Sequence, residues 1–256
     1  MPFTLAHPAA VLPLRGRAQL RTAPLVIGAL VPDTSYYLPV SIGRYAIGNH
    51  TFTGSYTTCL LLGYALLAAL LVLRRPLTAL LSARARALCL GALEPFRRSA
   101  REWVWAAPAI VLGVWTHLLW DSFTHTEGWM VLRVAALSAP VIIGSYQVAV
   151  YHLLQYLSSV LGLAVLAAWY RRLPAPPADP HAAHPRAGPV LLLVAAAALL
   201  IGSVQALEYF ARTHLLYRTL NVLLTSSLAW FALLYLAAGV LVTVEHALER
   251  VPERRA

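Results

Sequence analysis

Three side chains that bind metal ions in proteins, His117, Asp121 and His125, follow one another at intervals of four residues. In a helix, four residues turn about 400° and rise roughly 6 Å, so His117 and Asp121 share one face and can hold one cation. His125 lies roughly 6 Å further along the axis. It joins the same ion only if the helix breaks after Asp121, and otherwise Asp121 has to bridge two ions.

The same stretch also fits a capped helix end, in which Asp121 and Thr124 bind backbone amides of the next turn. Ionisable groups at the end of an apolar segment usually serve function, which favours a metal or catalytic role. Three further candidate ligands, His7, Asp33 and His50, stand earlier in the sequence. Whether they reach the first three depends on the elements that carry them.

The composition indicates a membrane protein. The 256 residues are 59% hydrophobic and 12% charged, and the mean hydropathy is +0.67, far from an ordinary soluble domain. All 20 basic residues are arginines, and the net charge is +10. They flank apolar segments and do not form one basic face with interleaved aromatic residues, which suits anionic membrane lipids as partners and excludes nucleic acid. The two cysteines indicate no disulfide framework.

Five apolar windows have about the 20 residues that cross a bilayer core. Four are regular, but the middle one carries Gln147, His152, Gln155, Ser158 and Ser159, which should face protein and not lipid. The windows are Ser55–Leu73, Val104–Trp120, Val141–Trp169, Pro189–Leu207 and Asn221–Val244. The sequence therefore predicts an all-α polytopic membrane helix bundle that forms one integral-membrane domain over residues 1–256.

The first 50 residues are apolar but carry six prolines, so no run is long enough to cross. They predict a broken helical segment that packs on one end of the bundle, with a short apolar helix over residues 25–33 that Pro32 ends. They do not resemble a cleaved signal peptide, because a basic start and a single apolar core are missing. Residues 174–188 predict a Pro-rich linker, and residues 189–244 a helical hairpin.

The arginines in the loops orient the spans. Seven of them lie between Arg74 and Arg101, and others flank the linker and the C-terminus. Five spans that start outside place all these segments in the cytoplasm, as the positive-inside rule requires. The chain is therefore expected in the bacterial cytoplasmic membrane with a cytoplasmic C-terminus. Leucines at helical spacing between Leu77 and Leu88 fit either an interfacial helix or a solvated loop.

This topology brings distant ligands to one face. His50 precedes the first span and His117 to His125 close the second, so both emerge on the extracytoplasmic side. His7 and Asp33 belong to the segment that leads into this face. We therefore expect one constellation, which binds a divalent metal, zinc above all. Six ligands exceed one tetrahedral shell and predict two ions, or one ion with outer partners. The predicted ligands are His7, Asp33, His50, His117, Asp121 and His125.

Four stretches resemble an uncharacterised bacterial integral-membrane family, a domain of unknown function, over most of the chain. They are MPFTLAHPAAVLPL at residues 1–14, LVIGALVPD at 25–33, HLLWDSFTH at 117–125 and QYLSSVLG at 155–162. More distantly, the order of His, Pro-Asp, His and His-x-x-x-Asp resembles membrane-bound metal-dependent hydrolases and zinc-dependent phospholipase C. This resemblance implies that the same six residues bind metal. The secreted phospholipases have a further His-x-x-x-Glu pair and use their N-terminal amine as a ligand, and this sequence shows neither.

A bound ion in this position would support hydrolysis, because it activates water and polarises a phosphoryl or carbonyl oxygen. The substrate expected at headgroup depth is a lipid or a lipid-linked phosphoester. Asp33 or Asp121 would be the base or the bridging ligand, and Arg44 or Arg133 a phosphate clamp.

The alternative is a membrane protein without enzymatic activity, whose polar cluster binds metal, fixes helix packing or conducts ions or protons. His152 and Gln155 are the deep polar residues that a pathway would use, and they also fit an interhelical hydrogen-bonding set. Ser158, Ser159 and Gly162 predict a small-residue packing face. His181 and His184 stand in the linker without a rigid support. The oligomeric state is not encoded in any pattern of the sequence.

Overall fold

The computed structural model describes residues 3–17, 19–37, 48–144, 146–174 and 186–249. These residues form two compact units. Of the described residues, the first unit contains those within 3–35, 48–68 and 95–174, and the second contains those within 36–37, 69–94 and 186–249. The single domain expected from the sequence stays a prediction.

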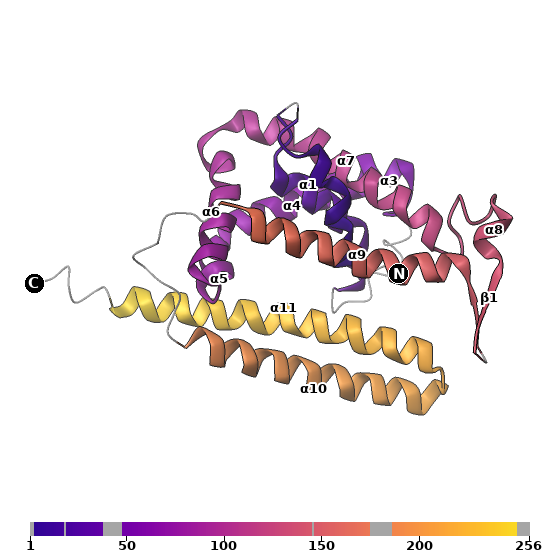
Figure 1. The fold of residues 1–256 in the computed structure, drawn as a ribbon. Coiled ribbons are helices and arrows are strands. Elements are labelled where there is room, and N and C mark those ends of the chain that lie inside the picture. Colours follow the sequence, from indigo (N-terminus) through magenta and orange to yellow (C-terminus); the bar gives the residue numbers. More distant parts are fainter. Residues whose placement is uncertain (1–2, 18, 38–47, 145, 175–185, 250–256) are drawn as a thin grey trace, which may run out of the picture. The chain divides into compact units, whose positions relative to one another are not determined.

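Helices dominate both units (Figure 1). The first part of the chain forms η1 (Thr4–Leu14), α1 (Thr22–Leu30), η2 (Val31–Tyr36), α3 (Phe52–Tyr56), α4 (Thr58–Val72), α5 (Arg74–Ala79), α6 (Ala83–Arg98) and α7 (Ala100–Thr124). The rest forms α8 (Ala135–Ser138), β1 (Pro140–Ile143), β2 (Tyr146–Ala149), α9 (Val150–Arg172), α10 (Ala187–Thr213) and α11 (Leu216–Glu249). The elements η1 and η2 are 3-10 helices.

Five helical segments are long and apolar enough to cross a membrane, which confirms the predicted all-α, multi-pass class. They are Phe52–Val72, which joins α3 and α4, Ala100–Thr124, Val150–Arg172, Ala187–Thr213 and Arg218–His246. The protein is therefore a multi-pass membrane protein by the length and composition of its helices.

The predicted middle span began too early in the chain. Residues 140–149 form an antiparallel hairpin in which Val141 pairs with Val148 and Ile142 with Gln147. Gly144, with φ of +61°, occupies the turn. A short run such as Val141 to Ile143 fits a strand as well as a helix, so hydropathy alone could not separate the two. The spanning helix begins at Val150, and of its polar residues Gln155 is buried.

The core of the first unit is the packing of α1 against α7. An added Cβ at Gly28 would lie 2.1 Å from the carbonyl oxygen of Ile110, and one at Gly113 would lie 2.3 Å from that of Leu25. The two backbones therefore meet where only glycine fits. Buried apolar side chains extend this contact, and they are Val11, Leu20, Leu25, Ala29 and Ala109. The N-terminal segment thus packs along α7 from its middle to Asp121, near its C-terminal end.

The segment is also attached to α9. The backbone N–H of Phe3 donates a hydrogen bond to Oγ of Ser159 over 3.0 Å. Further along α9, Gly162 packs against Ala6, with an added Cβ only 3.0 Å from the Cβ of Ala6. The predicted small-residue face of α9 therefore contacts η1.

The second unit contains the helical hairpin of α10 and α11, which lie side by side in Figure 1. His214 ends α10 in the left-handed conformation, with φ of +54°. Helix α5 packs on this hairpin, and the hydroxyl of Tyr235 donates to the carbonyl oxygen of Leu77 over 2.8 Å. The arginine-rich segment before α7 is helical over Ala83–Arg98, and its place at the membrane interface stays a prediction.

Candidate metal centre

The C-terminal end of α7 carries three of the predicted ligands. His117 and Asp121 lie one turn apart on one face, and both are buried. The helix ends at Thr124, and His125 has an extended backbone with φ of −118° and ψ of 144°. Its N–H still donates to the carbonyl oxygen of Asp121 over 3.1 Å. Because the helix ends here, the side chain of His125 turns back toward Asp121.

His117 is held by α1. Its Nδ1 lies 2.8 Å from the carbonyl oxygen of Ala29, and its side chain is 0% exposed. A carbonyl oxygen only accepts hydrogen bonds, so Nδ1 carries the proton. In the neutral imidazole Nε2 then carries the lone pair. The contact of Nδ1 with the backbone of α1 fixes the orientation of the ring, as such contacts usually do for histidines that bind metal.

Asp33 stands in the first turn of η2, directly after the proline that was predicted to end the apolar helix. Thr4 donates its hydroxyl to Oδ2 of Asp33 over 2.5 Å. Burial by itself would raise the pKa of Asp33, but the contact with His50, the charge of His117 and the Thr4 hydrogen bond together hold this pKa below its ordinary value. The carboxylate is therefore ionised at neutral pH.

His50 lies in the turn before α3. The next residue, Thr51, caps this helix, since its hydroxyl oxygen accepts from the N–H of Gly54 over 2.9 Å. His50 places Nε2 3.2 Å from Oδ1 of Asp33 and 3.8 Å from Oδ2 of Asp121. The cap thus fixes the turn that positions this imidazole.

Four of the six predicted residues form a group that could hold a metal ion. Each offers one ligand atom, and these atoms all lie within 4.8 Å of one another. Nε2 of His117 is 3.1 Å from Oδ2 of Asp121 and 3.7 Å from Oδ1 of Asp33. Two ligands at about 2.1 Å from a tetrahedral zinc ion are about 3.4 Å apart, so the spacing fits one small cation. The group is Asp33, His50, His117 and Asp121.

The two remaining histidines, His7 and His125, contact Oδ1 of Asp121, whereas His117 and His50 face Oδ2. Oδ1 lies 3.2 Å from Nε2 of His7 and 3.3 Å from Nδ1 of His125. The ring of His7 also stacks on that of His117, with centroids 3.9 Å apart and planes at 16°. Burial is the main cause that lowers the pKa of His125 below its ordinary value. His7 and His125 therefore surround Asp121 without joining the group of four.

The site is buried on one side and open on the other. The side chains of His117, His7, Asp33 and Asp121 are 0%, 2%, 3% and 10% exposed, whereas those of His50 and His125 are each 30% exposed. Water or a substrate would therefore reach the cluster past His50 and His125.

One buried atom tests whether a cation fits. Among the described residues Nε2 of His117 has no hydrogen-bond partner, although carboxylate oxygens of Asp121 and Asp33 lie close by. An Nε2 atom that faces two buried carboxylates requires a positive charge, which a proton on the imidazole or a bound cation would supply. The residues present therefore fit a divalent ion.

The structure brings all six predicted residues together around Asp121. It also adds Thr4 and the carbonyl of Ala29, which sequence reasoning missed because no spacing rule relates a hydroxyl or a backbone oxygen to a distant ligand. Arg133 lies over the ring of Trp129, 4.3 Å from its centroid. Arg44, His181 and His184 lie outside the described residues.

These observations define a class: a multi-pass membrane protein with a buried Asp/His cluster at the end of one spanning helix. Residues 1–244 match the family described as "Domain of unknown function (DUF4184)", and the chain belongs to this family. Comparison with curated proteins and with solved structures found no match.

Proposed function

We propose that the protein is a membrane-bound metal-dependent hydrolase that acts on a lipid or a lipid-linked phosphoester. The observation that carries this proposal is the spacing of the four ligand atoms of Asp33, His50, His117 and Asp121, all within 4.8 Å of one another. The distant sequence resemblance to metal-dependent hydrolases supports the same reaction class. The family description names no activity.

The ligand set favours zinc, because two imidazoles and two carboxylates suit this ion and its tetrahedral geometry. One ion accounts for the geometry better than two. His7 and His125 both contact Oδ1 of Asp121, while His117 contacts Oδ2. We assign His7 and His125 as outer partners that orient Asp121, as carboxylate and histidine pairs do around other zinc sites.

When bound, zinc lowers the pKa of a water molecule toward neutrality and polarises a phosphoryl oxygen. The residues of the chain then divide the remaining work. The low pKa of Asp33 suits a ligand and makes it a weak base. His125 is better placed to accept a proton, because its lowered pKa leaves the imidazole neutral at pH 7 and its side chain is 30% exposed.

A substrate at headgroup depth is supported by the surroundings of the cluster. Trp120 and Trp129 are 42% and 57% exposed beside the end of a spanning helix, and tryptophans are enriched at membrane interfaces. Arg133, next to Trp129 through its cation–π contact, offers a guanidinium at the same end of α7. Such a group binds phosphate well.

The competing interpretation is a cluster that only stabilises helix packing or conducts ions. The four ligand atoms of Asp33, His50, His117 and Asp121 lie within 4.8 Å of one another, and this convergence favours a metal over a purely structural ion pair between His117 and Asp121. An ion pathway would need polar residues through the bilayer, and the candidate ligands gather at one end of α7.

Metal analysis of the full-length protein in detergent tests the proposal. We expect one zinc ion per chain after exchange into a zinc buffer, and release of phosphate or headgroup from phosphatidate or polyprenyl phosphate in vesicles. A purified, folded protein without any bound divalent ion would refute the metal site. A protein that binds zinc and cleaves neither class of substrate would refute the hydrolase.

We further infer that the cluster faces the extracytoplasmic side of a bacterial cytoplasmic membrane. Cys89 is exposed and Cys59 is 0% exposed, so a membrane-impermeant maleimide should react with Cys89 alone. We expect labelling in inside-out vesicles and none in intact cells. Labelling of intact cells would invert the orientation.

A further inference from the structure

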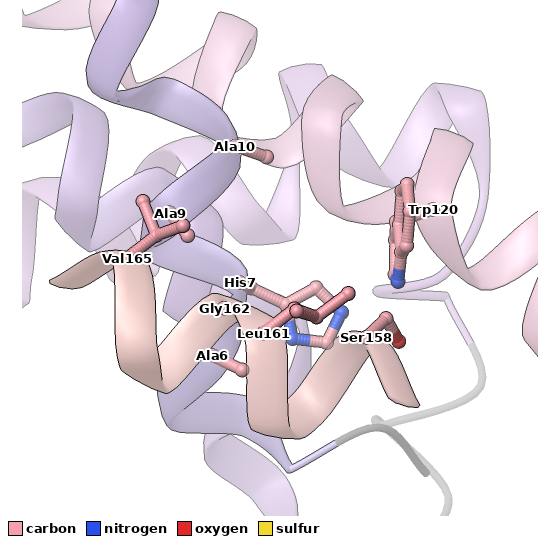
Figure 2. Close-up of a pocket in the computed structure, with 9 residues that line it drawn as sticks. All are labelled: Ala6, His7, Ala9, Ala10, Trp120, Ser158, Leu161, Gly162 and Val165. Carbon is pink, nitrogen blue, oxygen red and sulfur yellow. The ribbon is translucent and has the colours of Figure 1, made fainter. Parts of the chain in front are cut away.

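A pocket of about 260 Å³ adjoins the cluster within the first unit. Its walls come from η1, from α9 and from Trp120 of α7 (Figure 2). Figure 2 shows the imidazole of His7 in the middle of the lining, with Trp120 and Ser158 on one side and Ala9 and Val165 on the other. One wall of the pocket is therefore η1, the element that carries His7.

The lining is apolar and carries no charged side chain apart from the titratable ring of His7. The hydroxyl of Ser158 donates to the carbonyl oxygen of Gln155 in its own helix over 3.1 Å. The close contact of Gly162 with Ala6 closes the gap between α9 and η1 on one side of the pocket. Such walls favour methylene groups and offer no cation to a phosphate.

Two residues connect the pocket to the candidate metal site. His7 lines the pocket and places Nε2 3.2 Å from Asp121, and Trp120 directly precedes Asp121 in α7. A molecule that fills the pocket and also reaches the cluster must combine an apolar chain with a group that binds a cation. The volume is below the roughly 300–1,000 Å³ of ordinary small-molecule sites, so it accepts one chain and excludes a bulky ring system.

We propose that this pocket holds one hydrocarbon chain of a membrane-lipid substrate whose phosphate group lies at the Asp/His cluster. This assignment rests on the proposed function and names the part of the protein that selects a lipid over a soluble phosphoester. Val165 is 49% exposed at the edge of the pocket, and α9 is long enough to span the membrane, so a chain can enter sideways from the bilayer.

The test uses the full-length protein in lipid nanodiscs and a phosphatidate with a diazirine near the end of one acyl chain. After illumination, we expect crosslinks in residues 4–14 and 158–165. Excess phosphatidate should compete with the probe better than diacylglycerol, which has the same chains and no phosphate. Crosslinks spread evenly around α9, or equal competition by both lipids, would show ordinary boundary lipid and overturn the proposal.

Two valines of α9 provide a matched pair of variants. Val165→Phe fills the pocket and excludes about two methylene groups, which should lower its crosslinking roughly tenfold. Val160 does not line the pocket and is 68% exposed, so Val160→Phe should change crosslinking by less than about twofold. An equal loss in both variants would contradict the assignment.

The readouts separate this inference from the proposed function. Crosslinking in the pocket by a protein that neither binds zinc nor cleaves lipid would support a lipid site and refute the hydrolase. Zinc binding and hydrolysis that persist with the same chain-length preference in Val165→Phe would overturn the pocket and leave the hydrolase intact.

Discussion

Asp121→Asn is the sharpest perturbation of the candidate site, because it keeps the shape of the side chain and removes one of the two negative charges around the ion. Four histidines lie within 3.8 Å of the Asp121 carboxylate, which is buried. Breaking a buried ion pair by removal of one partner costs about 3–5 kcal/mol. At about 1.4 kcal/mol per tenfold, the affinity for zinc should fall about 100- to 4,000-fold.

The measurement is a competition titration of the purified protein with a chromophoric zinc chelator, together with metal analysis. Glu127→Gln is the control, because it makes the same change of charge at an exposed position a short distance along the chain. Thermal unfolding without metal reports whether each variant is folded. A folded Asp121→Asn protein with the affinity of the wild type would refute the assignment of Asp121 as a ligand.

Three further predictions follow from the same geometry. Thr4→Val removes the hydrogen bond to Asp33, so the affinity for zinc should fall about 10- to 100-fold. Thr4→Ser keeps the hydroxyl and should retain the affinity of the wild type. Equal zinc affinities of the two variants would contradict the role of Thr4 in positioning Asp33. Gly28→Ala forces a Cβ against the carbonyl of Ile110 and should destabilise the protein by about 1–3 kcal/mol in thermal unfolding. Gly91→Ala is the control, because its added Cβ meets nothing within 4 Å and should not destabilise the protein. Equal effects of the two variants would contradict the close contact of α1 with α7. Acidification from about pH 8 to pH 5 should weaken zinc binding, because protons compete with the metal for histidine ligands. Asp33 stays ionised in that range because its pKa is lowered, so a zinc affinity that does not change with pH would argue against histidine ligands.

Much of this arrangement was predictable from the residues. The interval between His117 and Asp121 predicts one helical face, and antiparallel spans place His50 at the same end. Pro32 predicts the break that places Asp33 beyond the apolar helix. These predictions depend on helical periodicity and on hydropathy, which the sequence records directly.

Other features depend on contacts that no local pattern encodes. The hairpin of β1 and β2 was missed because a short apolar run does not distinguish strand from helix. The division of the histidines between the two oxygens of Asp121 results from the register of α1 on α7, which Gly28 and Gly113 permit. Glycines in a sequence do not reveal which backbone they approach.

The contact between α1 and α7 has a consequence for biosynthesis. Ala29 and His117 are 88 residues apart, and at about 5–20 residues per second a ribosome needs roughly 4 to 18 s to add the residues between them. During that delay the N-terminal segment with His7 and Asp33 has been synthesised, but α7, the helix that will bury these two residues, has not. Nascent chains stalled before residue 117 should therefore expose this segment to protease, and longer ones should protect it.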